Sequence, residues 1–256
     1  SDSAEMVTQL VFGDVVEVLA RDRQWLSVRN VADGYEGWID EKMVLAVDQT
    51  WLASIGEWEF VRAASLSLVG SWAGSPLPLH LSLGAKIPRT PPRTPPTAGP
   101  RIQVTIGEWQ LELDAQEVCP ASAPSPKTLV ALSGSYLGAP YLWGGRTPSG
   151  GDCSGLTQML FILMGIYLPR DASDQAMEGD QVELLDLCEP GDLVFFDNDD
   201  GRIIHVGVIL TRNDEGDLRV AHASGRVRID KLDQQGIFNA DEGKYTHRLR
   251  MVKRVL

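Results

Sequence analysis

The chain is poor in cysteine and histidine. Its 256 residues include only four histidines, and its three cysteines are Cys119, Cys153 and Cys188. An odd number of cysteines without a CxxC pair excludes both a disulfide framework and a zinc knuckle. At least one thiol stays free in a monomer, and a free cysteine is ordinarily a small buried hydrophobe. Any catalytic role for a cysteine therefore needs support from its surroundings.

A long apolar run and an excess of positive charge are also missing. The stretch Met159–Ile166 is interrupted by Gly165, and it is well short of the roughly 20 residues that a membrane span needs. The formal net charge is −12, so nucleic acid and anionic membranes are poor partners, whereas a ligand with an amine is a good one. No secretory signal pattern begins at Ser1. That start fits a cytoplasmic protein, a processed envelope protein or a trimmed chain, so the compartment stays open.

Residues 1–50 predict a small β-barrel. Alternating apolar residues in VVEVLA (15–20), WLSVRN (25–30) and EGWID (36–40) indicate three short strands separated by polar turns. Short strands at such close spacing are typical of small barrels. The pattern FGD, WLSV and DGYEGWI resembles bacterial SH3-like domains over about 45 residues.

Residues 51–121 predict a second small β-domain, also SH3-like. Strand-like stretches occur at 77–83 and 101–106, and the phrases IGEWEF (55–60) and IGEWQL (106–111) resemble each other. Between them, residues 88–100 contain 6 prolines among 13 residues. This insertion is expected to be an extended, exposed loop or linker.

Residues 127–256 predict an α+β domain after a linker, SAPSPK, at 122–127. A helix is expected over 153–164, because Leu156, Met159, Leu160 and Leu163 follow an i, i+3, i+4, i+7 pattern. Strand-like runs follow at LVFF, HVGVIL, RVAHAS and VRIDKL, separated by polar or glycine turns. Helices followed by an antiparallel meander define the α+β class.

The stretch GGDCSGLTQ (150–158) carries the most specific chemistry. Asp152 is a preferred N-cap residue, which puts Cys153 in the first turn of the helix. Free backbone N–H groups and the helix dipole are expected there to lower the pKa of the thiol. A nucleophilic thiolate also needs an imidazole as proton carrier, held by a third group.

Two of the four histidines lie in the same predicted domain, in strands. His205 opens HVGVIL and His222 lies within RVAHAS, and neighbouring strands can bring them together. Each alone is more often an ordinary strand-end residue, but a helix-capping cysteine in a glycine-rich loop favours a catalytic set. His80 and His247 are interpreted as exposed or hydrogen-bonded polar residues without a role.

The order of several motifs identifies a family resemblance. PYLWGG, GGDCSGLTQ, LPRDASDQ, PGDLVFF, HVGVIL and AHASG, in that order, resemble the NlpC/P60 cysteine peptidases over about residues 127–256. The resemblance implies a papain-like fold with Cys153 as nucleophile, His205 as general base and His222 as the group that orients the base. It also implies that the hydroxyl of Tyr141 stabilises the oxyanion together with the backbone N–H of Cys153.

An SH3-like domain before such a catalytic domain resembles the layout of γ-D-glutamyl-L-diamino acid endopeptidases. These cut peptidoglycan stem peptides between D-glutamate and the diamino acid, and the relatives closest in layout act on peptides with a free L-alanine amine. An ammonium group prefers carboxylates and hydroxyls. The resemblance therefore implies an amine-binding pocket made by Asp152, Ser154, Tyr35 and Glu5.

Two other functions remain open at this stage. Papain-like Cys–His sites support several acyl transfers, so an amidase or acyltransferase acting on similar peptides is one alternative. A non-catalytic cell-wall-binding module is the other. No metal or cofactor is expected, and the partner expected is a peptidoglycan-derived peptide bound by a monomer. Whether the third peptide residue is diaminopimelate or lysine is not fixed by the sequence, nor is the role of the middle β-domain.

Overall fold

A computed structural model describes residues 4–55, 57–61, 66–72, 75–89, 101–106, 109–114, 118–213 and 216–256. The chain divides into two compact units, one of Leu10–Ser122 and one that combines Ser1–Gln9 with Ala123–Leu256. Mixed helix and sheet with a small N-terminal β-domain agrees with the predicted class. Within the described residues, no helix has the length and apolar character needed to cross a membrane.

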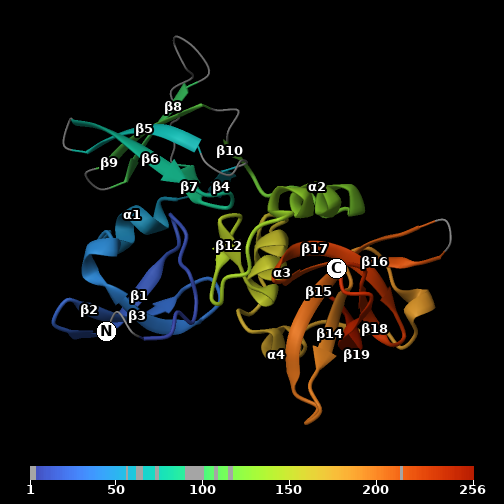
Figure 1. Ribbon diagram of the computed structural model, residues 1–256. Helices are drawn as coiled ribbons and strands as arrows, with labels where there is room; N and C mark the ends of the chain where they lie inside the picture. Colours follow the sequence, from blue (N-terminus) through green and yellow to red (C-terminus); the bar gives the residue numbers. More distant parts are fainter. Residues whose placement is uncertain are drawn as a thin grey trace. The chain divides into compact units, whose positions relative to one another are not determined.

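The Leu10–Ser122 unit begins with a three-stranded antiparallel sheet in the order β1–β2–β3 (Figure 1). Its strands are β1 (Val16–Asp22), β2 (Trp25–Asn30) and β3 (Glu36–Asp40). The alternation of apolar residues predicted all three, and β2 and β3 have the predicted bounds. Leu26 and Val28 of β2 are buried, as a half-buried strand requires.

Two further sheets complete this unit (Figure 1), in the orders β10–β4–β7 and β6–β5–β9–β8. They follow the short helices η1 (Glu41–Met43) and α1 (Gln49–Ala53). The strands are β4 (Glu57–Val61), β5 (Leu66–Trp72), β6 (Ser75–Leu81), β7 (Lys86–Arg89), β8 (Arg101–Ile106), β9 (Trp109–Asp114) and β10 (Val118–Cys119). Strand β8 has the predicted bounds, and the 77–83 stretch is largely β6. Of the proline-rich insertion 88–100, only Pro88 and Arg89 are described. They end β7, an edge strand, where proline is tolerated.

The core of this unit is formed by aliphatic side chains from several of its strands, and Phe12 and Trp51 pack against it. Gly13 lies beside β7 with a φ of 84°, and a Cβ at this position would meet the Lys86 carbonyl oxygen at 2.1 Å. The buried Lys86 ammonium pairs with the buried Asp14 carboxylate at 2.8 Å. The FGD motif therefore joins the segment before β1 to the second half of the same unit.

The other unit begins, after its N-terminal segment, with helices and short strands. Helix α2 (Pro126–Tyr136) is capped by Ser125, whose hydroxyl accepts the Thr128 N–H, and has proline at its first turn. The hairpin β11 (Arg146–Thr147) and β12 (Gly150–Gly151) leads into α3 (Cys153–Ile162), which is followed by α4 (Ala172–Gln175).

A seven-stranded antiparallel sheet follows, in the order β13–β19–β14–β15–β16–β17–β18 (Figure 1). The predicted meander is confirmed, and an additional pairing of β18 with β19 closes it on itself. The strands are β13 (Asp180–Gln181), β14 (Leu193–Asp197), β15 (Ile203–Arg212), β16 (Leu218–Ser224), β17 (Arg226–Asp233), β18 (Gly236–Asn239) and β19 (Lys244–Arg254), with the 3-10 helix η3 (Leu185–Leu187) after β13.

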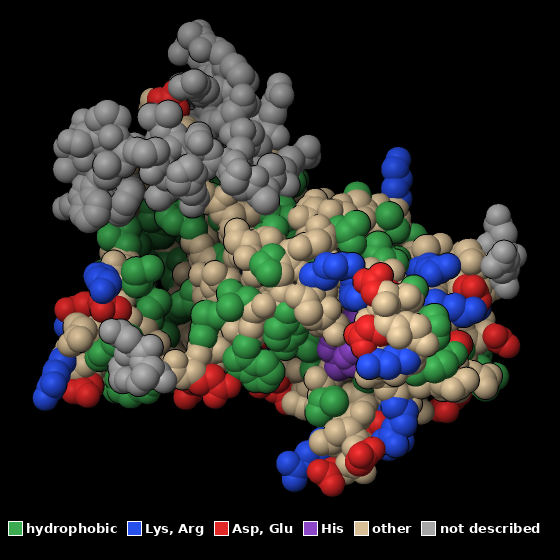
Figure 2. Space-filling view, viewed as in Figure 1, with side chains coloured by type: hydrophobic (Ala, Val, Ile, Leu, Met, Phe, Trp, Pro, Cys, Tyr) green, Lys and Arg blue, Asp and Glu red, His purple; other side chains and the backbone are tan. Residues whose placement is uncertain are grey.

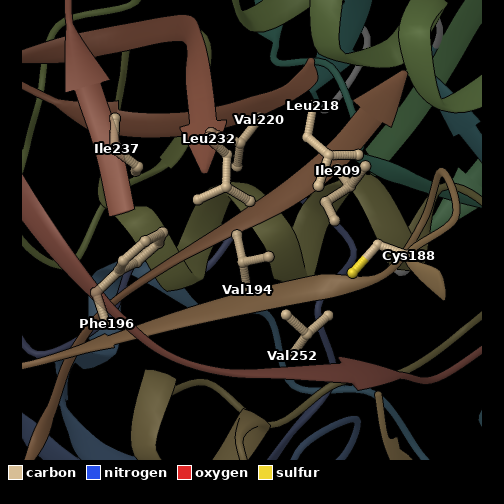
Figure 3. Close-up of a cluster of buried hydrophobic side chains, with 9 residues drawn as sticks. All are labelled: Cys188, Val194, Phe196, Ile209, Leu218, Val220, Leu232, Ile237 and Val252. Carbon is tan, nitrogen blue, oxygen red and sulfur yellow. The ribbon is translucent and has the colours of Figure 1, made fainter. Parts of the chain in front are cut away.

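Inward-facing side chains of these strands fill the closed sheet (Figure 3). Cys188 belongs to this cluster, together with Val194, Phe196, Ile209, Leu218, Val220, Leu232, Ile237 and Val252. The short apolar runs of residues 193–252 thus contribute side chains to one core. Cys188 is a packing residue here, as the ordinary interpretation of a free cysteine expects.

Helix α3 packs against β15 and β16 and is buried on every side. The i, i+3, i+4, i+7 pattern predicted one apolar face, whereas all ten residues are buried. The polar residues of the helix are accommodated by hydrogen bonds. The Thr157 hydroxyl donates to Gln175 Oε1 at 2.7 Å, and Gln158 Nε2 donates to the Leu168 carbonyl at 3.0 Å. These hydrogen bonds anchor the buried helix and give a rigid base for the residue at its N-terminus.

Candidate active site

Cys153 is the first residue of α3, as predicted. Asp152 is the N-cap, and its Oδ1 accepts the Gly155 N–H at 2.7 Å. The preceding loop lies close to this turn, because a Cβ on Gly155 would meet the Gly145 carbonyl oxygen at 2.2 Å. Glycine at position 155 therefore lets the loop and the helix start pack together.

The electrostatics of Cys153 correct one expectation. The thiol is buried, and burial, reinforced by the neighbouring Asp152 carboxylate, raises its pKa to about 11. The N–H groups of Val206 and Ser154 hydrogen-bond the sulfur and oppose this shift. The predicted lowering by the helix N-terminus is thus present but is outweighed by desolvation. In the free protein at neutral pH the group is a thiol.

Asp152 does more than cap the helix. Arg170 Nη1 and Nη2 donate to its Oδ1 and Oδ2 at 3.0 and 2.6 Å, and the Gly144 N–H donates to Oδ2 at 2.8 Å. Arg170 Nη1 also donates to the Ser154 hydroxyl at 2.9 Å. All three side chains are buried. Arg170, which the sequence interpretation did not single out, therefore fixes both residues that flank Cys153.

His205 and His222 are brought together, as predicted. They lie on the adjacent strands β15 and β16, and His205 Nε2 is 2.9 Å from His222 Nδ1. Both rings are buried. Burial lowers the pKa of His205 well below its usual value, and the neighbouring His247 and His222 add to this effect. His205 is therefore a neutral imidazole at neutral pH. The next residue, Val206, donates its N–H to the Cys153 sulfur, so His205 and Cys153 lie at the same site.

Asp230 extends this chain of side chains and was missed by the sequence interpretation. Its Oδ2 lies 3.0 Å from His222 Nε2, and Arg228 and Asp230 form a salt bridge. Burial raises the pKa of the Asp230 carboxyl, but hydrogen bonds from His222 and Arg228 outweigh it, so the pKa lies below its ordinary value. Asp230 is thus a carboxylate at neutral pH.

The charged Asp230 fixes the tautomers of both rings. A carboxylate only accepts hydrogen bonds, so His222 donates to it from Nε2, and the neutral form of His222 has its lone pair on Nδ1. His205 then donates from Nε2 to that lone pair and carries its own lone pair on Nδ1. Nδ1 is therefore the nitrogen of His205 that can take a proton.

His247 also lies at the site, which the sequence interpretation did not expect. Its ring stacks on His205 with centroids 4.1 Å apart and an angle of 25° between the planes. One ring nitrogen from each of His205, His222 and His247 lies within 4.8 Å of the others. His247 is on β19, and β14 pairs with both β19 and β15, an arrangement that could not be deduced from local periodicity.

Tyr141 lies beside β12, the strand that leads into the nucleophile turn. Its backbone forms a bridge with Gly151, and its side chain is 37% exposed. Partial burial raises the pKa of its hydroxyl to about 12, and the nearby Cys153 and Asp152 contribute. Tyr141 therefore keeps its proton at neutral pH and can donate a hydrogen bond.

The N-terminal segment belongs to the same unit as the site. Glu5 accepts a hydrogen bond from Trp143 Nε1 at 2.7 Å, and Thr8 Oγ1 accepts one from Arg170 Nε at 2.9 Å. Glu5 is thus next to the loop that precedes Cys153. Tyr35 lies in the other unit, after β2, and its backbone N–H donates to Asp33 Oδ1. Its predicted role stays a prediction, and the side chain of His80 is outside the described part.

Sequence comparison identifies two families in the chain. Residues 138–243 match the NlpC/P60 family, and residues 1–43 match the bacterial dipeptidyl-peptidase SH3 domain. Both matches agree with the resemblances deduced from the motifs.

Individual relatives extend over most of the chain. Dipeptidyl-peptidase 6 of Lysinibacillus sphaericus is 30% identical over 250 residues, which cover 91% of this chain and 86% of that protein. A γ-D-glutamyl-L-lysine dipeptidyl-peptidase of Bacillus cereus is 28% identical over 257 residues, 92% of this chain and 73% of that protein. The crystal structure of an NlpC/P60 family protein from Bacillus cereus has the same fold, with a TM-score of 0.80 at 24% identity over 97% of this chain and 82% of that one.

Proposed function

This chain belongs to the NlpC/P60 family, and we propose that it is a cysteine peptidase that hydrolyses the γ-D-glutamyl–L-diamino acid bond of peptidoglycan stem peptides. The observation that carries the proposal is the position of Cys153. Its sulfur accepts the Val206 N–H, next to His205, whose ring is held by His222 and Asp230. A nucleophile, a base and an orienting group thus follow one another, as covalent acyl transfer requires.

In the proposed reaction, the Cys153 proton moves to His205 Nδ1 as the sulfur attacks the γ-carbonyl carbon. Since both groups are neutral in the free protein, this transfer accompanies substrate binding rather than preceding it. The oxyanion accepts hydrogen bonds from the Tyr141 hydroxyl and the Cys153 N–H. His205 then gives its proton to the departing amine of the diamino acid. A water molecule, deprotonated by His205, hydrolyses the thioester and releases the glutamyl product.

His222 and Asp230 act on His205 rather than on the substrate. The imidazolium formed at His205 donates from Nε2 to His222 Nδ1, and the Asp230 carboxylate keeps that nitrogen as an acceptor. The negative charge of Asp230 also favours the positive charge that develops on the pair. We assign Asp230 as a positioning residue of the catalytic set.

The preference for a free N-terminal L-alanine is proposed from the acidic side chains around the site. Relatives of this chain are named dipeptidyl-peptidases, which supports release of a dipeptide such as L-Ala-γ-D-Glu. Asp152 and Ser154 are candidates for contact with the ammonium group, although Arg170 already neutralises the Asp152 charge. Glu5, exposed beside Trp143, is the carboxylate that can contribute more. Tyr35, which belongs to the other unit, is kept as a proposed substrate-binding residue on the sequence resemblance alone.

The test is incubation of the full chain with L-Ala-γ-D-Glu-diaminopimelate, its lysine counterpart and the N-acetylated form of each. We expect release of L-Ala-γ-D-Glu from a free-amine peptide only. Cys153→Ala abolishes the release, whereas Cys188→Ala, which removes a buried thiol from the core of the closed sheet, leaves it intact. The proposal is contradicted if neither free-amine peptide is hydrolysed, or if the acyl group is transferred to an added amine in preference to water.

A papain-like arrangement of the catalytic domain is part of the same proposal. The N-terminal cysteine of a buried helix and a histidine on a neighbouring strand support it. The three ranges predicted as domains, 1–50, 51–121 and 127–256, are likewise retained as a proposal about separate folding units.

A further inference from the structure

We infer that His205, His222 and His247 form a site for a zinc ion, and that zinc bound there blocks the catalytic base. The three rings come from three strands, β15, β16 and β19, of the closed sheet. The inhibitory effect rests on the proposed function, whereas the binding itself does not. No local motif indicates a metal site, because the three histidines are 17 and 25 residues apart along the chain.

The spacing of the ring nitrogens suits a tetrahedral ion. Zn–N bonds of 2.0–2.1 Å place two nitrogen ligands about 3.3 Å apart. The closest pair here, His205 Nε2 and His222 Nδ1, is 2.9 Å apart, and all three nitrogens lie within 4.8 Å of one another. Zinc binding therefore requires the rings to rotate away from the present hydrogen-bonded and stacked arrangement. Three histidines leave a fourth position for water, a common zinc geometry.

The surroundings of two rings are those of metal-ligating histidines. A ligating histidine usually donates its second N–H to a carboxylate or other oxygen, which fixes the tautomer. His222 Nε2 lies 3.0 Å from Asp230 Oδ2, and His247 Nδ1 lies 2.9 Å from Thr246 Oγ1. The bond to Asp230 leaves His222 Nδ1 as the ligand atom of that ring, and donation from His247 Nδ1 to the Thr246 hydroxyl would leave Nε2 as the ligand atom of His247.

Charge and access also favour a cation. Asp230 and Glu242 both act on His247 as negative charges. Two arginines nearby are already paired, Arg228 with Asp230 and Arg248 with Asp197. His247 is half-buried, and Figure 2 shows histidine atoms reaching the surface between acidic and basic side chains.

Zinc at this position disables the base through the tautomer of His205. The ion takes the lone pair of Nε2, so the remaining ring proton must reside on Nδ1. Nδ1 then has no lone pair with which to accept the thiol proton. The bond between His205 and His222 is lost at the same time, because both of its nitrogens turn to the metal.

Isothermal titration with ZnCl2 tests the binding on the full chain carrying Cys153→Ala, after removal of metal with a chelator. We expect one ion per chain. In the same background, His247→Phe, which preserves the aromatic stack, lowers the zinc affinity about tenfold or more, and Asp230→Asn lowers it about tenfold. His80→Phe is the control and leaves the affinity unchanged. Circular dichroism confirms that each variant is folded.

Two results would overturn the inference: no zinc binding by the Cys153→Ala chain, or equal affinity after His247→Phe. Inhibition is measured separately, as loss of peptide hydrolysis by the wild-type chain with zinc and its recovery with chelator. Absence of any hydrolysis refutes the proposed function and leaves the titration result standing. Binding without inhibition refutes the tautomer argument alone.

Discussion

Arg170 and Asp152 form a two-pronged salt bridge in the interior of the catalytic unit. Nη1 and Nη2 donate to Oδ1 and Oδ2 at 3.0 and 2.6 Å, and both side chains are at most 8% exposed. A buried guanidinium without its carboxylate keeps its desolvation cost, so the pair is necessary once one member is present. The residue before the nucleophile is therefore held by a charge 18 residues downstream.

Asp152→Ala is expected to destabilise the protein strongly. It removes the helix cap and leaves Arg170 unpaired, which together cost about 3–5 kcal/mol in the free energy of unfolding. Chemical denaturation measures the difference. Arg226→Ala, which breaks an exposed salt bridge with Asp241, is the control and leaves the denaturation midpoint nearly unchanged. If Asp152→Ala is as stable as the control, the pair does not hold the helix start.

The role of Asp152 in binding an amine is separated by Asp152→Asn. The amide oxygen can still accept the Gly155 N–H, while the negative charge is lost. If the carboxylate contacts the ammonium group, KM for the free-amine peptide rises about tenfold and KM for an N-acetylated analogue does not. An equal change for both peptides assigns Asp152 to the scaffold.

The protonation states of Cys153 and His205 predict an unusual alkylation profile. Burial raises the pKa of the thiol to about 11 and lowers that of His205 well below its ordinary value. The resting pair is thus thiol and imidazole, and only the thiolate reacts with iodoacetamide. In a chain with Cys119→Ser and Cys188→Ala, the alkylation rate of Cys153 should rise about tenfold per pH unit from 7 to 10. A rate that is constant from pH 6 upward indicates a thiolate–imidazolium pair instead.

Asp230→Asn is expected to slow hydrolysis without abolishing it. The carboxylate that fixes the His222 tautomer is replaced by an amide, so His205 loses its defined partner, and kcat falls about ten- to a hundredfold. KM should change little, because Asp230 is assigned to the histidines and not to the substrate. An unchanged kcat, whatever the effect on KM, would remove Asp230 from the catalytic set.

The effect of Asp230→Asn on the free energy of unfolding is expected to depend on pH. The pKa of Asp230 lies below its ordinary value in the folded protein, so its charge contributes stability above the unfolded value of about 3.9. Asp230→Asn is therefore less stable than the wild type at pH 7. The difference should shrink as pH falls below about 4 through the folded value. A difference that stays constant down to pH 2 would assign the loss to packing. Urea denaturation at a series of pH values measures it.

The sequence predicted the local elements and the motif residues of the site, but not the groups that depend on long-range pairing. Strands β2, β3 and β8 and the N-cap at Asp152 follow from alternation and capping chemistry, which act over a few residues. Asp230 reaches His222 only because β16 and β17 pair with His222 opposite Arg228. Register of this kind is set by the whole sheet and not by the periodicity of one strand.

His247 and Arg170 were missed for related reasons. His247 meets His205 because β14 pairs with both β15 and β19, a long-range arrangement that leaves no local signal in the sequence. Arg170 lies in a loop after α3, and its direction depends on how that loop returns to the helix start. The prediction of a lowered pKa for the Cys153 thiol was wrong, because burial raises this pKa by more than the helix N-terminus lowers it. Burial of this kind cannot be deduced from local sequence.

Two glycine substitutions provide a matched test of how closely the loop approaches the nucleophile turn. A Cβ on Gly155 would lie 2.2 Å from the Gly145 carbonyl oxygen, whereas a Cβ on Gly134 in α2 would have no atom within 4 Å. Gly155→Ala should therefore cost about 1–3 kcal/mol in the free energy of unfolding. Gly134→Ala should stabilise the helix by about 0.5–1 kcal/mol, since alanine loses less backbone entropy.

The activity of these two variants shows whether the loop at Gly145 must keep its close contact with the start of α3. To admit the new methyl group, the loop at Gly145 must move away from the start of α3, and Tyr141 and the Asp152 contacts lie along that loop. Gly155→Ala is therefore expected to lose hydrolysis at temperatures where it is still folded, and Gly134→Ala is expected to keep it. If Gly155→Ala matches the wild type in both melting temperature and rate, the loop does not need its present position, and the proposed oxyanion role of Tyr141 loses its structural basis.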